Sequence, residues 1–217
     1  MKPFPLFVIA AFLRLGRKYG IDHLHAEALT MLSVDFPSTL RGYDECTKAA
    51  WPRVIDLKGC SLSAVVNLAR ENDVQSILPC ALYMLCRFAH YNSTPFFDSI
   101  SRITLATADI KSCVEAHSEL LRLQLTETFG WLDVRPSPAN PCAHIMCSMT
   151  KKAIFYTYYY PQAPLCPFEP WNSHWEGGLC SNCVVTSRRL HEQGRATIWG
   201  QLPALFRLPS WDELLKQ

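Results

Sequence analysis

The chain has 217 residues, of which 49% are hydrophobic, and a net charge of +2 from 21 basic and 19 acidic residues. This length and this apolar content suffice for a buried core and exclude a disordered chain. So small a net charge excludes attraction to nucleic acid or anionic lipid by the field of the whole molecule, and a charged partner would need a local patch.

The first apolar stretch, Phe4 to Leu13, has some features of a signal peptide. Pro3 and Pro5 interrupt its start, however, and no pair of small residues marks a cleavage site. The stretch is also shorter than the ~20 residues of a membrane span. We therefore expect a buried helix over residues 8 to 18, ended by Gly20, and no membrane segment.

Two helical hairpins are predicted in the first 90 residues. In the first, a second helix begins at Ile21 and stops before Pro37, which bars the preceding residue from helical geometry. The second hairpin extends from Leu62 to Cys86 and turns at Asn72-Asp73. Such short connections make each pair of helices antiparallel neighbours.

The two hairpins align without a gap when the sequence is shifted so that Ala11–Leu32 lies over Ala64–Leu85. This is either an internal repeat or the pattern that any two amphipathic hairpins share. Each hairpin has an apolar face that it cannot bury alone, so we expect the two to pack together.

Residues 40 to 60 contain Gly42, Pro52 and Gly59 and predict an irregular connector. A third helical block is predicted from Thr107 to Phe129 by its periodic apolar positions.

Seven prolines after Trp131 exclude long helices between Val134 and Trp171. These are Pro136, Pro138, Pro141, Pro161, Pro164, Pro167 and Pro170. The aromatic segment Ala153–Tyr160 is then either a short strand or an aromatic packing pad. A last helix from Cys183 to Leu202 and a terminal turn at 211 to 214 complete a mainly α fold. We expect stacked antiparallel helical hairpins and a Cys- and Pro-rich C-terminal lobe with little or short β structure.

The strongest local motif is a set of four cysteines, Cys142-x4-Cys147 and Cys180-x2-Cys183. Structural zinc takes four thiolate or imidazole ligands in tetrahedral geometry, usually as two close pairs. The second pair directly precedes the last predicted helix, whose positive end favours thiolates. The four cysteines are therefore candidate ligands of a structural zinc ion.

Two alternatives to this zinc site remain open. The cysteines can be ordinary half-buried thiols, and three histidines are alternative ligands, namely His144, His174 and His191. The other cysteines fall largely in helical patterns, where a free thiol acts as a small buried apolar group. A chain this long does not need disulfides, so we expect an intracellular protein of the cytoplasm or nucleus.

No motif predicts catalysis, since the chain lacks a phosphate-binding glycine loop, a nucleophile elbow and an HExxH pair. We assign no catalytic or cofactor-binding residue and expect a non-catalytic module that binds other proteins. Arg188, Arg189, His191 and Arg195 are expected to form a solvated helix face. The alternative is a zinc-stabilised, transcription-related module that touches nucleic acid through these arginines, and a further alternative is a cysteine hydrolase.

Several segments resemble the BTB/POZ family of protein-interaction domains. LRLGRKYGIDHLHAEAL (Leu13–Leu29) is similar to the last two BTB helices, most closely in BTB proteins of mushroom-forming fungi. In these proteins, segments like Phe36–Leu40, Asn67–Cys86, LCSNC and Trp199–Leu214 follow in the same order. The resemblance implies a BTB-type adaptor.

The same resemblance implies that the chain is divided into three parts. Residues 1–40 would be the C-terminal helix pair of a BTB-like domain, 60–132 a BACK-like helical extension, and 133–217 the Cys-rich lobe. Because most of the BTB core would be missing, family dimerisation and cullin recruitment are not implied. The missing sheet would leave an apolar face uncovered around four residues, namely Phe4, Phe7, Ile9 and Phe12.

Overall fold

The computed structural model describes residues 3–49, 55–56, 62–91, 96–135, 142–160 and 162–216. It is mainly helical, with a single two-stranded pairing among these residues, which confirms the predicted fold class. The chain forms two compact units: residues 1–116 together with 201–217, and residues 117–200. The expected divisions at 40, 60 and 132 do not coincide with these units.

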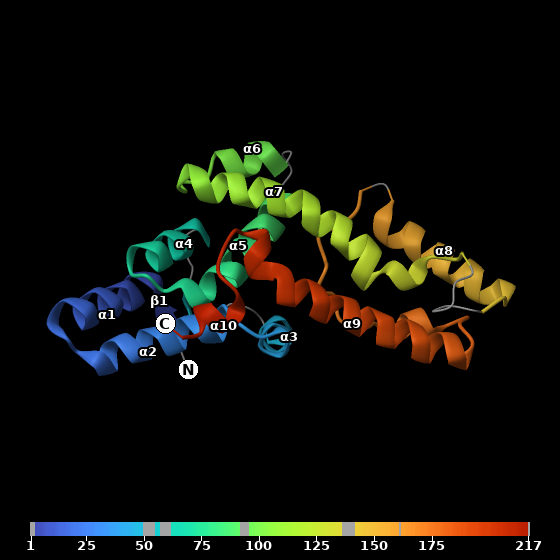
Figure 1. Cartoon of the computed structure of the whole chain (residues 1–217), viewed down its shortest axis with the longest axis horizontal. Helices are drawn as coiled ribbons and strands as arrows, with labels where there is room; N and C mark the ends of the chain where they lie inside the picture. Colours follow the sequence, from blue (N-terminus) through green and yellow to red (C-terminus); the bar gives the residue numbers. More distant parts are fainter. Residues whose placement is uncertain are drawn as a thin grey trace. The chain divides into compact units, whose positions relative to one another are not determined.

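The first unit begins with the expected hairpin of α1 (Leu6–Tyr19) and α2 (Asp22–Asp35), which lie side by side (Figure 1). Leu13 and Leu32 are fully buried between them. The prediction of an uncovered apolar face around Phe4, Phe7, Ile9 and Phe12 needs correction in part. Phe7 is 72% exposed, but Ile9 is completely buried.

The second hairpin consists of α4 (Leu62–Glu71), the 3₁₀ turn η1 (Gln75–Ile77) and α5 (Leu78–His90). Its turn copies that of the first hairpin under the sequence alignment. Gly20 and the aligned Asp73 are both left-handed, at φ 64° and 61°. The residue after each donates its N–H over 2.9 Å to an aligned carbonyl, that of Gly16 or of Ala69. The backbone of the two turns is therefore the same at the aligned positions.

Replacing Gly20 with alanine should lower the free energy of unfolding by about 1 kcal/mol, because a left-handed residue with a Cβ is strained. No atom lies within 4 Å of the added Cβ, so the cost is conformational only. Urea denaturation of the full chain measures it. The Asp73→Gly variant at the aligned turn should change stability by no more than a few tenths of a kcal/mol. Equal losses in both variants would contradict this account.

The two hairpins pack together, as expected. Residues of α1 and α4 line one shallow groove of about 340 Å³, which Arg14 and Glu71 bridge with a 2.8 Å ion pair. Both side chains are more than half exposed, so the pair adds little stability. Contacts of α2 with η1 join the hairpins a second time.

A short parallel pairing joins β1 (Phe4–Pro5) to β2 (Ile55–Asp56). The buried carboxylate of Asp35, at the end of α2, accepts the N–H of Ile55 over 2.8 Å. This hydrogen bond attaches the strand to the first hairpin, since a buried acceptor needs a donor.

The predicted irregular connector at 40 to 60 is wrong in its first half. Residues Leu40–Lys48 form helix α3, whose N-cap Thr39 accepts the N–H of Gly42 over 3.1 Å. A side-chain cap satisfies one unpaired N–H of the first turn and so outweighs the low helix propensity of glycine. The predicted connector residues Pro52 and Gly59 lie outside the described residues.

The remaining helices of the first unit are α6 (Phe96–Ser101), the start of α7 (Thr107–Leu123) and the expected terminal turn α10 (Trp211–Leu214). Arg70 and the buried Asp109 form a 2.6 Å ion pair that joins α4 to α7. Cys80, Cys86 and Cys113 are buried, and burial raises the pKa of the first two. They are core residues, as predicted.

The second unit contains the helix that the sequence did not predict. Helix α8 (Ile145–Tyr159) occupies the proline-free interval between Pro141 and Pro161 and includes the segment expected to be a strand or pad. Prolines set its limits without interrupting it. Its inward side chains pack on an aromatic core, and this packing outweighs the β propensity of its tyrosines.

The order of elements in the second unit is the end of α7, the π-helix η2 (Gln124–Thr128), the 3₁₀ turn η3 (Gly130–Leu132), α8, the 3₁₀ turn η4 (Ser173–Glu176) and α9 (Ser181–Leu205) as far as Gly200. The core between them is aromatic. Phe129 lies edge-to-face against Trp175 and Tyr159, and Trp131 packs against Trp171. The predicted aromatic pad therefore exists as part of this core, but on a helix.

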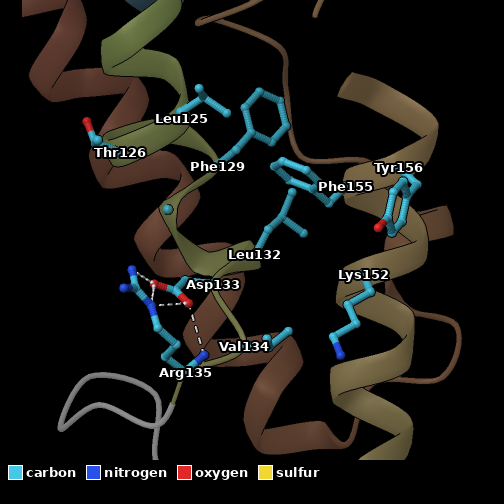
Figure 2. A pocket seen from close by; sticks show the side chains of 11 residues that line it. Leu125, Thr126, Phe129, Leu132, Asp133, Val134, Arg135, Lys152, Phe155 and Tyr156 are labelled. Atoms are coloured by element: carbon cyan, nitrogen blue, oxygen red, sulfur yellow. Dashed lines mark hydrogen bonds and ion pairs between the residues drawn. The ribbon is translucent and has the colours of Figure 1, made fainter. Parts of the chain in front are cut away.

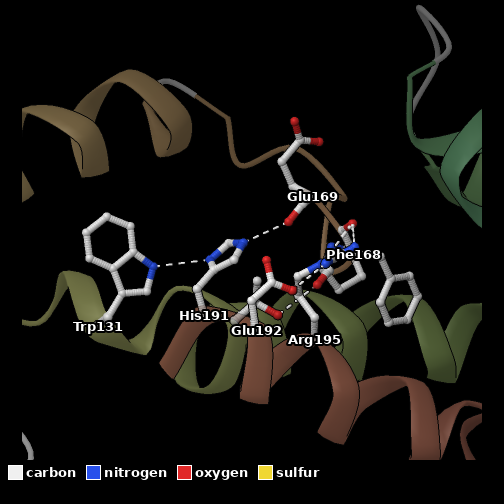
Figure 3. A network of polar contacts seen from close by, with 8 residues as sticks. Trp131, Phe168, Glu169, His191, Glu192 and Arg195 are labelled. Atoms are coloured by element: carbon white, nitrogen blue, oxygen red, sulfur yellow. Dashed lines mark hydrogen bonds and ion pairs between the residues drawn. The ribbon is translucent and has the colours of Figure 1, made fainter. Parts of the chain in front are cut away.

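A proline-rich strap, residues 164–169, is fixed by buried polar side chains, of which Figure 3 labels His191 and Arg195. Gln124 contacts the Pro164 carbonyl and the Cys166 N–H, and Thr128 donates to the Pro167 carbonyl. Because proline lacks an N–H, the strap cannot form a regular ladder, and side chains supply its partners instead.

Helix α9 contributes the other half of this network. Arg195 donates to the Phe168 carbonyl over 3.1 Å and pairs with Glu192 at 2.6 Å, and it is only 3% exposed. The expected solvated face is therefore wrong at Arg195 and at His191, while Arg188 and Arg189 are exposed. The spacing of four polar residues along a helix does not reveal which of them points inward once the helix packs on both sides.

His191 is neutral in the folded chain. Its Nδ1 accepts the indole N–H of Trp131 over 3.2 Å, so its Nε2 carries the proton and donates to the Glu169 carbonyl over 2.7 Å. Burial lowers the pKa of His191 to about 4. The unfolded chain therefore binds a proton below pH ~6.5 that the folded chain does not.

Stability should fall as the pH decreases from ~6.5 towards ~4, and His191 should contribute about 2 kcal/mol of this loss by pH ~5. Urea denaturation, followed by tryptophan fluorescence at pH ~7.5 and ~5, measures the change. The His191→Gln variant should be less stable at the higher pH and should lose this part of the pH dependence. An unchanged pH slope in that variant would exclude His191 as its origin.

Candidate metal centre

The four predicted cysteines come together at the start of two helices. Cys142 precedes α8, and Cys147 lies in its first turn. Cys180 directly precedes α9, and Cys183 lies in its first turn. Helix N-termini carry unpaired N–H groups and a partial positive charge, so both helices stabilise thiolates at this point.

Gly178 brings the second pair close to α8. Its φ of 90° suits glycine, and a Cβ at this position would lie 2.4 Å from Oγ1 of Thr150. The close approach lets the N–H of Cys180 donate to Sγ of Cys147 over 3.2 Å. The Gly-Gly sequence before the CxxC pair is therefore part of the site's construction.

The geometry of the four sulfurs suits tetrahedral coordination. All four lie within 4.8 Å of one another, and those of Cys142 and Cys180 are 3.9 Å apart. Zinc–sulfur bonds of ~2.3 Å at tetrahedral angles separate the sulfurs by ~3.8 Å. A metal ion would need only a small contraction of the cluster.

The thiols differ in acidity. The N–H of Cys183 and neighbouring thiols lower the pKa of Cys180 to about 7, whereas burial raises the pKa of Cys147 and of Cys183 above the ordinary thiol value. A single thiolate is thus readily formed, and the others need a cation to favour their charged form. A metal ion supplies that charge and displaces the protons.

Lys151, one helical turn after Cys147, is a member of this site that sequence reasoning missed. It is 3% exposed. Burial lowers its pKa, and the charges of Cys183, Cys142 and Cys147 act in the opposite direction. An ammonium group here offsets part of the −2 charge of a divalent ion bound by four thiolates. The signal available in the sequence was a lysine at i+4 from a candidate ligand.

The histidines predicted as alternative ligands do not join the cluster. His144 and His174 are exposed, and His191 belongs to the aromatic core. In the part of the chain that the structure describes, the group consists of cysteines alone. A closed set of four thiolates leaves no coordination position for water or substrate, which is typical of structural rather than catalytic sites.

Comparison with protein-family models, with curated proteins and with solved structures gave no match to this chain. None of the described helices combines the length and the hydropathy needed to cross a membrane.

Proposed function

We propose that the chain is a non-catalytic adaptor that binds other proteins and that a structural zinc ion stabilises its second unit. The observation that carries the proposal is the closed group of four thiols at two helix N-termini. Zinc held by four cysteines supports folding and does no chemistry, so the output of such a unit is a surface.

Metal analysis of the purified full-length chain tests the proposal. We expect about one zinc per chain. Zinc should be released as a thiol-reactive reagent modifies the four cysteines. A strong chelator should then shift the tryptophan fluorescence, because Trp175 lies in the core of the same unit. A chain that binds no metal although all four thiols are reduced would contradict the proposal.

Thiol labelling separates the adaptor from a cysteine hydrolase. The pKa of Cys180, lowered to about 7, makes this thiol reactive in the metal-free chain. Zinc should protect it. A Cys180 that stays hyper-reactive at neutral pH in the zinc-loaded chain would favour the hydrolase.

The adaptor proposal extends to the BTB type and to an intracellular location in the cytoplasm or nucleus. Two stacked hairpins with a repeated left-handed turn support it, because they match the segments that carry the BTB resemblance. A cytosolic or nuclear signal of the tagged chain in cells tests the location.

A nucleic-acid-binding module remains the rival proposal. It rests on the exposed Arg188 and Arg189, since Arg195 is occupied in the core. Retention on DNA that falls steeply with salt would favour the nucleic-acid-binding module. A lack of retention at low salt would favour the adaptor.

A further inference from the structure

The second unit has an apolar groove between the π-helix region and α8 (Figure 2). Its volume is about 770 Å³. Leu125, Phe155 and Tyr156 are each more than 40% exposed there. The apolar lining consists of Leu125, Phe129, Leu132, Val134, Phe155 and Tyr156. The exposed apolar side chains mark an interaction surface, because monomeric proteins rarely leave such groups gathered in one place.

The outer face of α8 extends this apolar surface. Met146, Met149 and Tyr156 on α8, and Tyr160 directly after its last residue, are each 59% to 75% exposed. With Ala153 between them, they occupy positions spaced three and four residues apart in alternation. This is the spacing of the contact positions in a coiled coil, and it presents one straight stripe to a partner helix.

The charge left unpaired in this groove is positive. Lys152 lies at the edge of the groove on α8 and has no ion-pair partner among the described residues (Figure 2). Between residues 142 and 168 the chain has no acidic residue. Asp133, an acidic residue that lines the groove, is bound by Arg135 at 2.6 Å. An acidic side chain on a partner would therefore find an unpaired ammonium group.

We propose that the groove and the α8 stripe bind an amphipathic helix of another protein that carries acidic residues beside its apolar face. This inference rests on the adaptor function proposed above and names its partner class. The apolar side chains of the partner would fill the groove and cover the stripe, and a Glu or Asp would pair with Lys152. A second copy of the chain fits less well, because pairing α8 with itself would add a second Lys152 and no acidic residue to balance it.

A displayed library of three-heptad amphipathic helices tests this, with its flanking positions varied between Glu and Lys. Selection on the zinc-loaded full-length chain should enrich Glu, and the Lys152→Glu variant should reverse the enrichment to Lys. The Met149→Ser/Tyr156→Ser double variant should weaken binding of the selected helix at least tenfold. The Phe7→Ser variant, which changes an equally exposed apolar residue of the first unit, should leave it unchanged.

The inference would be overturned if the Lys152→Glu variant still enriched Glu. It would also be overturned if the double variant bound the selected helix as tightly as the unchanged chain. A dimer of the chain that sedimentation detects and that the double variant dissociates would overturn it as well. Zinc content of each variant separates this failure from failure of the proposed function. A chain that keeps its zinc but selects no helix refutes only the docking surface.

Discussion

Replacing Cys183 with alanine is expected to release the metal and to unfold residues 117–200. The side chain is 2% exposed and belongs to the group of four sulfurs. With three thiolates left, the site becomes open and its affinity falls. The binding free energy of a structural zinc ion, on the order of 10 kcal/mol, exceeds the stability of a typical unit of this size.

Metal content and near-ultraviolet circular dichroism measure this effect. Cys166→Ala is the matched control, since Cys166 is also a buried cysteine of the second unit but lies in the aromatic core. It should keep its zinc and lose only about 1 kcal/mol for the small cavity. A Cys183→Ala chain that retains zinc and its native spectrum would exclude the four-cysteine site.

Replacing Gly194 with alanine should be the most destabilising single methyl addition in α9. The new Cβ would lie 2.4 Å from the carbonyl carbon and oxygen of Glu127, in the π-helix packed against it. Both contacts are backbone, so no side-chain rotation relieves them. The helix and the π-helix must separate, at a cost of about 3 kcal/mol or more.

Gly200 in the same helix provides the control. Nothing lies within 4 Å of a Cβ added there, so Gly200→Ala should be neutral or should stabilise the helix by up to ~1 kcal/mol. Thermal and urea denaturation compare the two variants. If both have the same stability, the close packing of Gly194 on the π-helix is not required for the fold.

Local sequence patterns predicted the hairpins and their turns. Gly20 and Asp73 mark left-handed positions, and the apolar spacing around Leu13 and Leu32 fixed which faces are buried. The spacing within each cysteine pair likewise marked four candidate ligands. Each of these features depends on residues near one another in the sequence.

Features that depend on distant neighbours were missed. Helix α8 forms because Tyr158 and Tyr159 find an aromatic core formed by Phe129 and Trp175. Arg195 is buried because the strap carbonyls need donors. Neither the core nor the strap can be inferred from the local spacing of these residues.

By itself, the sequence determined a mainly helical chain with two helical hairpins and four candidate metal ligands, since helix periodicity, turn residues and cysteine spacing are local properties. Only the tertiary structure decided that the cysteine pairs meet, that Lys151 is buried beside them and that His191 is excluded. Those outcomes depend on which side chains the folded backbone brings together, because burial and hydrogen bonding are set by neighbours far apart in the chain.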